Sequence, residues 1–346
     1  MNINMKYIMI MNSMIYVSTL YKSRLVYDHS SSFHYNQISF SHVKVNWIIR
    51  YLNKFYCNSS TDGSEFELLV SEIRYLYRSC PDLFSFSEKE VENLVKSILS
   101  REYRFEPLQV VRYNSNNAGV FRQLRLSSNA NATFCLLPNP KDEIVLMSMT
   151  RIVTRHYLES SFCSKESLFF REHPHHFYKE VEKLGQVKKV IQLDLSRTFQ
   201  TISKDRLFDL LDKILHNLYI KDLIHDFCQL EAKDDNGNDM KYFGIPPVGI
   251  LSEALLNIYL SIFDREFMRA YPDLPYVRYF HEVYIVFPSN KMEEFDPDEE
   301  FTTFFMELNL DGNVSILSPG KKDILCYAGK IGINKDGYII LTPKKE

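Results

Sequence analysis

The sequence predicts an α+β fold, an antiparallel sheet backed by helices, from three observations. The apolar run Val190–Leu193 ends at the acidic Asp194, as a short buried strand would. Apolar residues recur at helical spacing from Leu207 to Leu218, which predicts one amphipathic helix after that strand, with Ser203 as its N-cap. Two short β-type runs, 276–279 and 283–287, lie close enough together to form a hairpin with residues 280–282 near its tip.

Length and charge limit the function classes. The 346 residues, 45% of them apolar, suffice for one large domain or two modest ones with a real core. The net charge is −3, from 41 basic and 44 acidic residues. A nucleic-acid-binding protein usually has a basic excess, because phosphate contacts dominate its affinity. We therefore expect any RNA-binding surface of this chain to be a local patch.

The cysteines and the N-terminus bear on localisation. None of the six cysteines forms a CxxC pair, which argues against a zinc ribbon and favours reduced thiols in a protein that is not secreted. The apolar stretch 6–20 is too short to span a membrane and is read either as a strand or short helix or as a targeting segment. The abundance of Asn, Ile, Lys, Tyr and Phe is typical of AT-rich coding DNA. An organelle (mitochondrion or plastid) and a bacterial cytoplasm both remain open, and no membrane is expected as a partner.

Further elements follow from local patterns. Residues 64–104 have helical spacing, with a helix start at Ser87, and residues 114–132 are Asn- and Ser-rich, as in a loop. The run Asp234–Gly237 is a turn signal that predicts a hairpin. A Gly- and Pro-containing segment then precedes a helix expected from near Ser252 to about Met268.

Three segments carry the candidate chemistry, and their order matters as much as their content. They are Val190–Phe199, which places a carboxylate at a strand end and an aromatic residue five positions later, Gly244–Leu260, and Val277–Glu282.

Together these segments resemble the palm of reverse transcriptases, most closely the group II intron-encoded type. The resemblance implies a reverse-transcriptase-type fingers and palm, with an antiparallel palm sheet backed by helices; no thumb is recognisable in the sequence. In that family the first segment supplies a metal-binding aspartate with a neighbouring backbone carbonyl, here Asp194 and Leu195, and an aromatic that screens the sugar 2′ position, here Phe199. The second family motif, G-x-P-Q-G-x-x-x-S-P-x-L-x-N-I-Y-L, is matched by the following residues: Gly244, Pro246, Ser252, Leu255, Asn257, Ile258, Tyr259 and Leu260. Gly249 stands where the group II type has a second nucleotide-facing glycine.

The resemblance extends more weakly over about residues 100–335. It implies an N-terminal extension (1–65), a fingers-like region (66–185) and a palm-like region (186–346). Arg171, within the Phe-Arg pair before a His-containing segment, corresponds to an RNA-binding position. The cluster His173, His175 and His176 suggests a metal site, but with Pro174 inside it a solvated loop is preferred.

The third family motif, Y-x-D-D, is altered here. It reads Tyr279-Phe280-His281-Glu282, so an imidazole replaces the first aspartate and a longer acid the second. The family's reaction uses two divalent ions held by oxygen ligands, Mg²⁺ or Mn²⁺, and neutral imidazole suits Mg²⁺ poorly. A one-ångström misplacement can cost about a hundredfold in rate. Magnesium-dependent polymerisation is therefore expected to be impaired, although Mn²⁺ would tolerate the imidazole better.

Other departures point in the same direction. Lys141, near the place where relatives bind the incoming triphosphate, is followed by two acids, Asp142 and Glu143, and is a poor clamp. Pro247 and Val248 replace residues of the nucleotide-facing loop. Only 346 − 329 = 17 residues follow Gly329, so we expect the family's basic thumb to be lacking or supplied by another chain.

Three hypotheses result. The first is a degenerate reverse-transcriptase-like protein that binds intron or other structured RNA, or assists intron splicing. The second is an active RNA-directed DNA polymerase with an altered metal site that uses Mg²⁺ or Mn²⁺. The third is a non-catalytic partner subunit of a polymerase or of a separate thumb chain.

Overall fold

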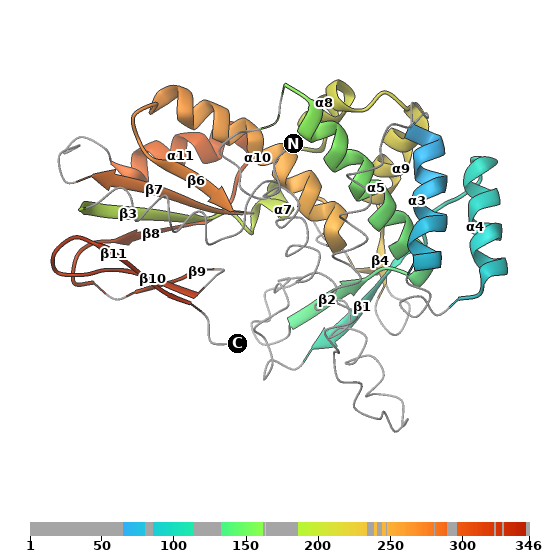
Figure 1. The fold of residues 1–346 in the computed structure, drawn as a ribbon, viewed down its shortest axis with the longest axis horizontal. Helices are drawn as coiled ribbons and strands as arrows, with labels where there is room; N and C mark the ends of the chain where they lie inside the picture. The colour runs from blue at the N-terminus through green and yellow to red at the C-terminus, as the bar shows by residue number, and fades with distance from the viewer. Residues whose placement is uncertain are drawn as a thin grey trace. The chain divides into compact units, whose positions relative to one another are not determined.

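The structure is a computed structural model that describes residues 65–79, 86–113, 133–161, 163, 186–233, 239–240, 244–246, 248–279, 281–288, 296–321, 323–326 and 329–343. Within these residues the chain combines helices with mainly antiparallel sheets, which confirms the predicted α+β class (Figure 1). It divides into two compact units, each made of several segments. The first comprises 1–156, 211–242 and 246–252, and the second comprises 157–210, 243–245 and 253–346. The predicted extension, fingers-like and palm-like regions stay a prediction.

The first unit combines helices with a small four-stranded sheet. Ser87 caps a helix as predicted, because its side chain accepts from the Glu90 backbone N–H while the Glu90 carboxylate accepts from the Ser87 N–H. The sheet order is β2-β1-β4-β5, in which β1 and β4 are parallel and the other pairs antiparallel. The elements lying wholly or mostly in this unit are α3 (Glu65–Ser79), α4 (Glu88–Leu99), β1 (Leu108–Tyr113), β2 (Thr133–Leu137), α5 (Pro140–Glu159), α9 (Leu218–Cys228), β4 (Ala232–Lys233) and β5 (Asp239–Met240).

The second unit is built on a four-stranded antiparallel sheet of order β6-β7-β3-β8. Helix α10 (Gly249–Ala270), whose first residues belong to the first unit, precedes the β6–β7 hairpin, and α11 (Pro297–Leu308) connects β7 to β8. The unit therefore has the βαββαβ topology of a split βαβ fold, in which another strand lies between the two strands that a helical connection joins. Its strands are β3 (Val187–Asp194), β6 (Tyr276–Tyr279), β7 (Glu282–Pro288) and β8 (Asn313–Leu317).

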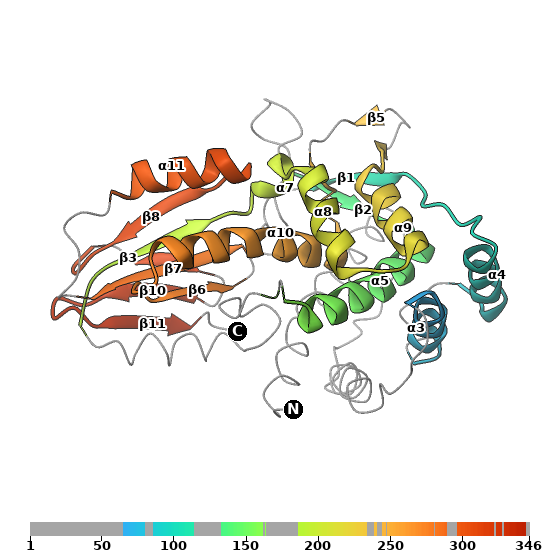
Figure 2. The same cartoon turned by 90° about the horizontal axis from the view of Figure 1, so that it is seen from above.

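The two faces of this sheet are covered differently. Figure 1 shows α10 and α11 on one side and the strands β9–β11 on the other, and Figure 2 shows the two helices lying along the strands. Val190, Val286 and Leu317 are buried against Ile331 and Ile333 of the three-stranded sheet. That sheet has the order β11-β10-β9 and consists of β9 (Ile324–Cys326), β10 (Gly329–Ile333) and β11 (Ile339–Pro343).

The predicted hairpin at 276–287 and the strand ending at Asp194 are confirmed, with small changes in their bounds. The predicted hairpin around 234–237 is also present as the β4–β5 pair, although its turn lies outside the described residues. The single helix predicted through Leu218 is wrong. Helix α8 (Lys204–Ile214) ends, Asn217 caps α9, and Leu218 is 69% exposed at the first turn of α9. Asn217 favours a new helix start because its side chain accepts from the Ile220 N–H.

Candidate functional site

The β3 strand brings together the acidic residues that the sequence singled out. Asp194, its last residue, lies directly opposite Glu282 of β7 on one side and Asn313 of β8 on the other. The Leu195 N–H donates to the His281 carbonyl at 2.9 Å, which ties the end of β3 to the hairpin tip. Side chains of directly opposed residues share one face of a sheet. Asp194, Glu282 and Asn313 therefore form one polar row across three strands.

Asp194 is held at the strand end by local contacts. Its Oδ1 accepts a hydrogen bond from the Ser196 N–H at 3.0 Å. His281 Nε2 lies 3.8 Å from the same oxygen, a distance at which a protonated imidazole forms an ion pair. The Asp194 side chain is 43% exposed and that of His281 16%. His281, at the tip of the hairpin, therefore lies beside the strand-end Asp194.

Two buried polar side chains that sequence reasoning missed, Tyr284 and Gln192, are linked to Glu282 by hydrogen bonds. Its Oε2 accepts from the Tyr284 hydroxyl at 2.6 Å, and the Tyr284 oxygen accepts from Gln192 Nε2 at 3.2 Å. Gln192 and Tyr284 are 5% and 3% exposed, and they are partners in the β3–β7 register. A glutamine between the apolar residues Ile191 and Leu193 was the available signal, because a buried amide needs a hydrogen-bond partner.

The predicted metal ligands, Asp194 and the Leu195 carbonyl, have the oxygen chemistry that a divalent ion prefers. Carboxylate and carbonyl oxygens suit Mg²⁺ or Mn²⁺. The Leu195 carbonyl accepts from the Thr198 N–H at 3.0 Å. Across the described part of the chain, no group of three or more His, Cys, Asp and Glu side chains is placed to hold a metal ion. Metal binding by Asp194 and Leu195 stays a prediction.

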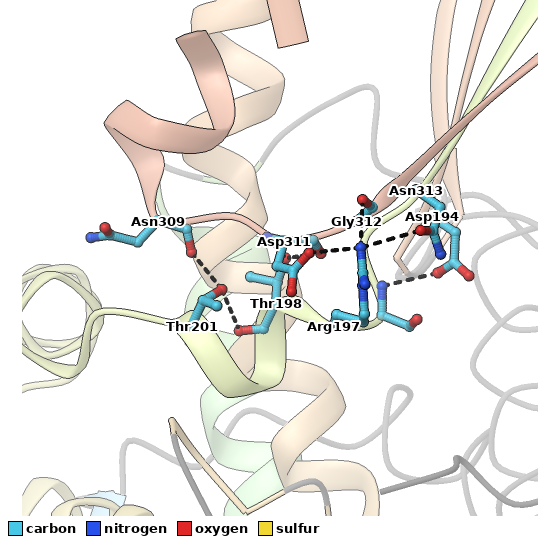
Figure 3. Close-up of polar contacts among 9 residues, drawn as sticks. Asp194, Arg197, Thr198, Thr201, Asn309, Asp311, Gly312 and Asn313 are labelled. Atoms are coloured by element: carbon cyan, nitrogen blue, oxygen red, sulfur yellow. Dashed lines mark hydrogen bonds and ion pairs between the residues drawn. The ribbon is translucent and has the colours of Figure 1, made fainter. Parts of the chain in front are cut away.

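The end of α11 and the loop that connects it to β8 lie beside the strand end that carries Asp194 (Figure 3). Backbone carbonyls of the last two residues of α11 and of the loop 309–312 accept hydrogen bonds from side chains of α8, of α10 and of residues 197–201. The pairs are Arg206 to Glu307, Tyr259 to Leu308, Thr201 to Asn309, Thr198 to Asp311 and Arg197 to Gly312. Arg197 also contacts the Asp311 carboxylate at 2.9 Å. The loop is thereby fixed to the strand end that carries Asp194.

Two glycines allow close approach of the backbone at this place. A Cβ at Gly312 would lie 2.5 Å from the Asp194 carbonyl oxygen. Gly244 has φ +72°, and a Cβ there would lie 1.9 Å from the Phe199 carbonyl oxygen. The Ile245 N–H donates to that same oxygen at 3.0 Å. Glycine at 244, the first residue of the second segment, is therefore required by its contact with α7 (Thr198–Thr201).

The most specific part of the second segment has structural partners. Asn257 Oδ1 accepts from Arg278 Nη1 at 2.6 Å, and Arg278 also forms two 2.7 Å hydrogen bonds with Asp264. Asn257, Asp264 and Arg278 are all fully buried. The Tyr259 hydroxyl donates to the Leu308 carbonyl at 2.7 Å. These residues join α10 to the β6 strand and to the end of α11.

The remaining predicted nucleotide- and RNA-contacting positions have mixed outcomes. Phe199 lies on α7 and its side chain is 2% exposed. Lys141, in the first unit, lies 3.4 Å from Glu90 Oε1, and Gly249 is the first residue of α10. Arg171 and the histidine cluster at 173–176 lie outside the described residues. Nucleotide or RNA binding by these residues stays a prediction.

Comparison with known proteins gives limited guidance. No protein-family model and no curated protein matches the chain. Among 318 matching chains of solved structures are one from a "Partial Cas6-RT-Cas1--Cas2 complex" and one from a "Cas6-RT-Cas1--Cas2 complex". Each has a TM-score of 0.42 and 12% identity over 66% of this chain, which spans 39% and 24% of theirs. Similarity at this level does not establish a shared activity. No helix among the described residues is long and apolar enough to cross a membrane.

Proposed function

We propose that this chain is a reverse-transcriptase-like protein of the group II intron type, with an impaired polymerase centre, that binds structured RNA. One observation carries the proposal. The strand-end Asp194 and the altered hairpin residues His281 and Glu282, far apart in sequence, are neighbours at one end of a βαββαβ sheet. That is the placement the resemblance implies for a polymerase palm. Gly244 and Asn257 support the same arrangement through their contacts with α7 and Arg278.

Impairment follows from the chemistry of the substituted positions. Nucleotidyl transfer by the two-metal route needs carboxylates that share two cations about 4 Å apart. His281 adds no negative charge when neutral, and when protonated it pairs with Asp194 in place of a cation. The Glu282 carboxylate is engaged by Tyr284. We therefore expect no nucleotide addition with Mg²⁺.

RNA binding is tested by filter retention of the full chain with a structured RNA and with a duplex DNA of equal length, from 25 to 300 mM salt. We expect RNA to be retained at low salt and lost as salt rises, because phosphate contacts release counterions. Splicing assistance would appear as faster self-splicing of a bound intron RNA. Absence of RNA retention at the lowest salt, in a folded preparation, would remove the proposal.

A second candidate is an active RNA-directed DNA polymerase with an altered metal site. The observation that favours it is Glu282, which keeps a carboxylate directly opposite Asp194. Primer extension on an RNA template with Mg²⁺ and, separately, Mn²⁺ distinguishes the two. Extension that disappears in Asp194→Asn would replace the first proposal, whereas no extension with either ion would eliminate the second.

A further inference from the structure

Asp194 and Glu282 lie opposite each other on β3 and β7, but their carboxylates are hydrogen-bonded in opposite directions along the sheet. Asp194 and Glu282 are register partners, so their Cβ atoms start on the same face. The Asp194 carboxylate is bonded forward, to Ser196 beyond the end of the strand. The Glu282 carboxylate is bonded backward, to Tyr284 in the next row of the same face.

The hydrogen bond that draws Glu282 back along β7 comes from a tyrosine whose ring is buried and fixed in position. Residues two apart in a strand are separated by about 7 Å, so the glutamate must lean along β7 to reach the Tyr284 hydroxyl. The ring of Tyr284 is buried together with Val190, Val286 and Leu317, which fixes the position of its hydroxyl. Gln192 donates to the same hydroxyl oxygen, so the hydroxyl hydrogen is directed to Glu282.

The contacts that draw the Asp194 carboxylate toward the hairpin tip are made by Ser196 and His281. Its Oδ1 accepts from the Ser196 N–H and lies within ion-pair distance of His281 Nε2. Both contacts lie on the hairpin-tip side of the row that Asp194 shares with Glu282. Asp194 and Glu282 are thus hydrogen-bonded away from each other, although they are register partners.

We propose that the Tyr284 hydroxyl, oriented by Gln192, withholds the Glu282 carboxylate from Asp194 and so weakens the binding of a divalent cation at this site. The proposal rests on the proposed function in treating Asp194 and Glu282 as the remnant of a cation site. It adds a specificity-determining residue, Tyr284, outside the three sequence segments. A hydrogen bond to a charged acceptor is among the stronger ones. When the bond from Tyr284 is removed, the Glu282 side chain can turn toward its register partner Asp194.

The opposite role for Tyr284 predicts the opposite result. Residues that hydrogen-bond a metal ligand commonly orient it, and their loss weakens metal affinity by about 10–100-fold. If Tyr284 instead withholds Glu282, removing the hydroxyl strengthens cation binding. The sign of the change in affinity therefore decides between withholding and orienting.

The experiment measures Mn²⁺ binding to the full chain by the loss of the free-ion electron paramagnetic resonance signal, at pH 7.5 without RNA or nucleotide. We expect Tyr284→Phe to bind Mn²⁺ at least about tenfold more tightly than the unaltered protein, since the freed carboxylate adds a charged ligand beside Asp194. Adding Glu282→Gln to Tyr284→Phe should abolish the gain. Unchanged or weaker binding by Tyr284→Phe overturns the proposal.

Two further variants keep the test decisive. Glu282→Asp shortens the acid by one methylene, so it loses Tyr284 without any change to the buried ring, and it should also gain Mn²⁺ affinity. It replaces Tyr284→Phe if that variant does not fold. Tyr276→Phe is the matched control, because it removes another tyrosine hydroxyl, which donates to Asp264 on the helix-covered side of the same sheet. A gain in Tyr276→Phe equal to that in Tyr284→Phe would show general loosening and overturn the proposal.

The outcome is separable from that of the proposed function. Mn²⁺ binding is read without RNA, and RNA retention is read without a divalent cation. A chain that binds RNA but gains no Mn²⁺ site in Tyr284→Phe loses only the role of Tyr284. A chain that gains the site but retains no RNA keeps that role and loses the proposed function.

Discussion

The buried ion pair of Asp264 and Arg278 gives a stability prediction whose size follows from its surroundings. Both side chains are 0% exposed and meet through two 2.7 Å hydrogen bonds. Burial lowers the pKa of Arg278, but the charge and hydrogen bonds of Asp264 outweigh it and hold that pKa above its ordinary value. The guanidinium therefore stays charged inside the unit, with Asp264 as its counterion and Asn257 as a further acceptor.

Replacing Asp264 by asparagine keeps the volume but leaves that cation without a counterion. Breaking a buried pair from one side costs about 3–5 kcal/mol in free energy of unfolding. Domains of ordinary stability have about 5–15 kcal/mol in total. Asp264→Asn should therefore remove a fifth or more of the free energy of unfolding.

Glu266→Gln is the matched control, because it makes the same carboxylate-to-amide change two residues away on α10. Its partner Arg269 is 79% exposed and Glu266 36%, so the loss should stay below about 1 kcal/mol. Urea unfolding at pH 7, followed by far-ultraviolet circular dichroism, measures both. Equal losses in the two variants would refute the reasoning. Replacing both buried partners, Asp264→Leu with Arg278→Met, should recover much of the loss, since no uncompensated charge remains.

Two other predictions concern a glycine and a buried acid. Gly312→Ala should lower the free energy of unfolding by about 1–3 kcal/mol, because its Cβ would press on the Asp194 carbonyl. A urea midpoint unchanged from that of the unaltered protein would contradict the close contact. Asp142, bonded by the Tyr103 hydroxyl and the Glu106 N–H, has its pKa raised by burial from 3.8 to about 6. Because the folded state holds this proton more tightly, its contribution is full below pH 3.8 and falls by about 3 kcal/mol as the pH rises to 6. Asp142→Asn should remove that part of the pH dependence, and stability curves that stay parallel from pH 4 to 7 would exclude it.

The strand, the hairpin and their acidic residues could be predicted because the signals are local. A strand-length apolar run ending at Asp194 and two β-type runs before and after His281 need no knowledge of distant residues. The resemblance to the reverse-transcriptase palm then implied that Asp194 and Glu282 would be close, and the β3–β7 register places them opposite each other. The break at Asn217 was missed because leucine spacing carried the helical pattern past a capping residue.

The hydrogen bonds that support the site could not be predicted from local sequence patterns, because each joins residues far apart along the chain. Asn257 and Arg278 meet across helix α10 and strand β6, and Tyr259 reaches the end of α11. Gln192 and Tyr284 become partners only through the strand register. Sequence periodicity gives the face of a residue but not its neighbour on the next strand, unless the register is already known.

These supports change what the retained motif residues imply. Asn257 accepts a hydrogen bond from the buried Arg278, Tyr259 donates one to the Leu308 carbonyl, and Gly244 permits a close backbone approach to Phe199. Each is needed for the fold whether or not a nucleotide ever binds. Their presence is therefore a sign of the fold, whereas His281 and Glu282 lie at the partly exposed end of the sheet. Cation binding at this end of the sheet is therefore tested at the contacts of Asp194 and Glu282, because the carboxylate of Glu282, the register partner of Asp194, accepts a hydrogen bond from the Tyr284 hydroxyl.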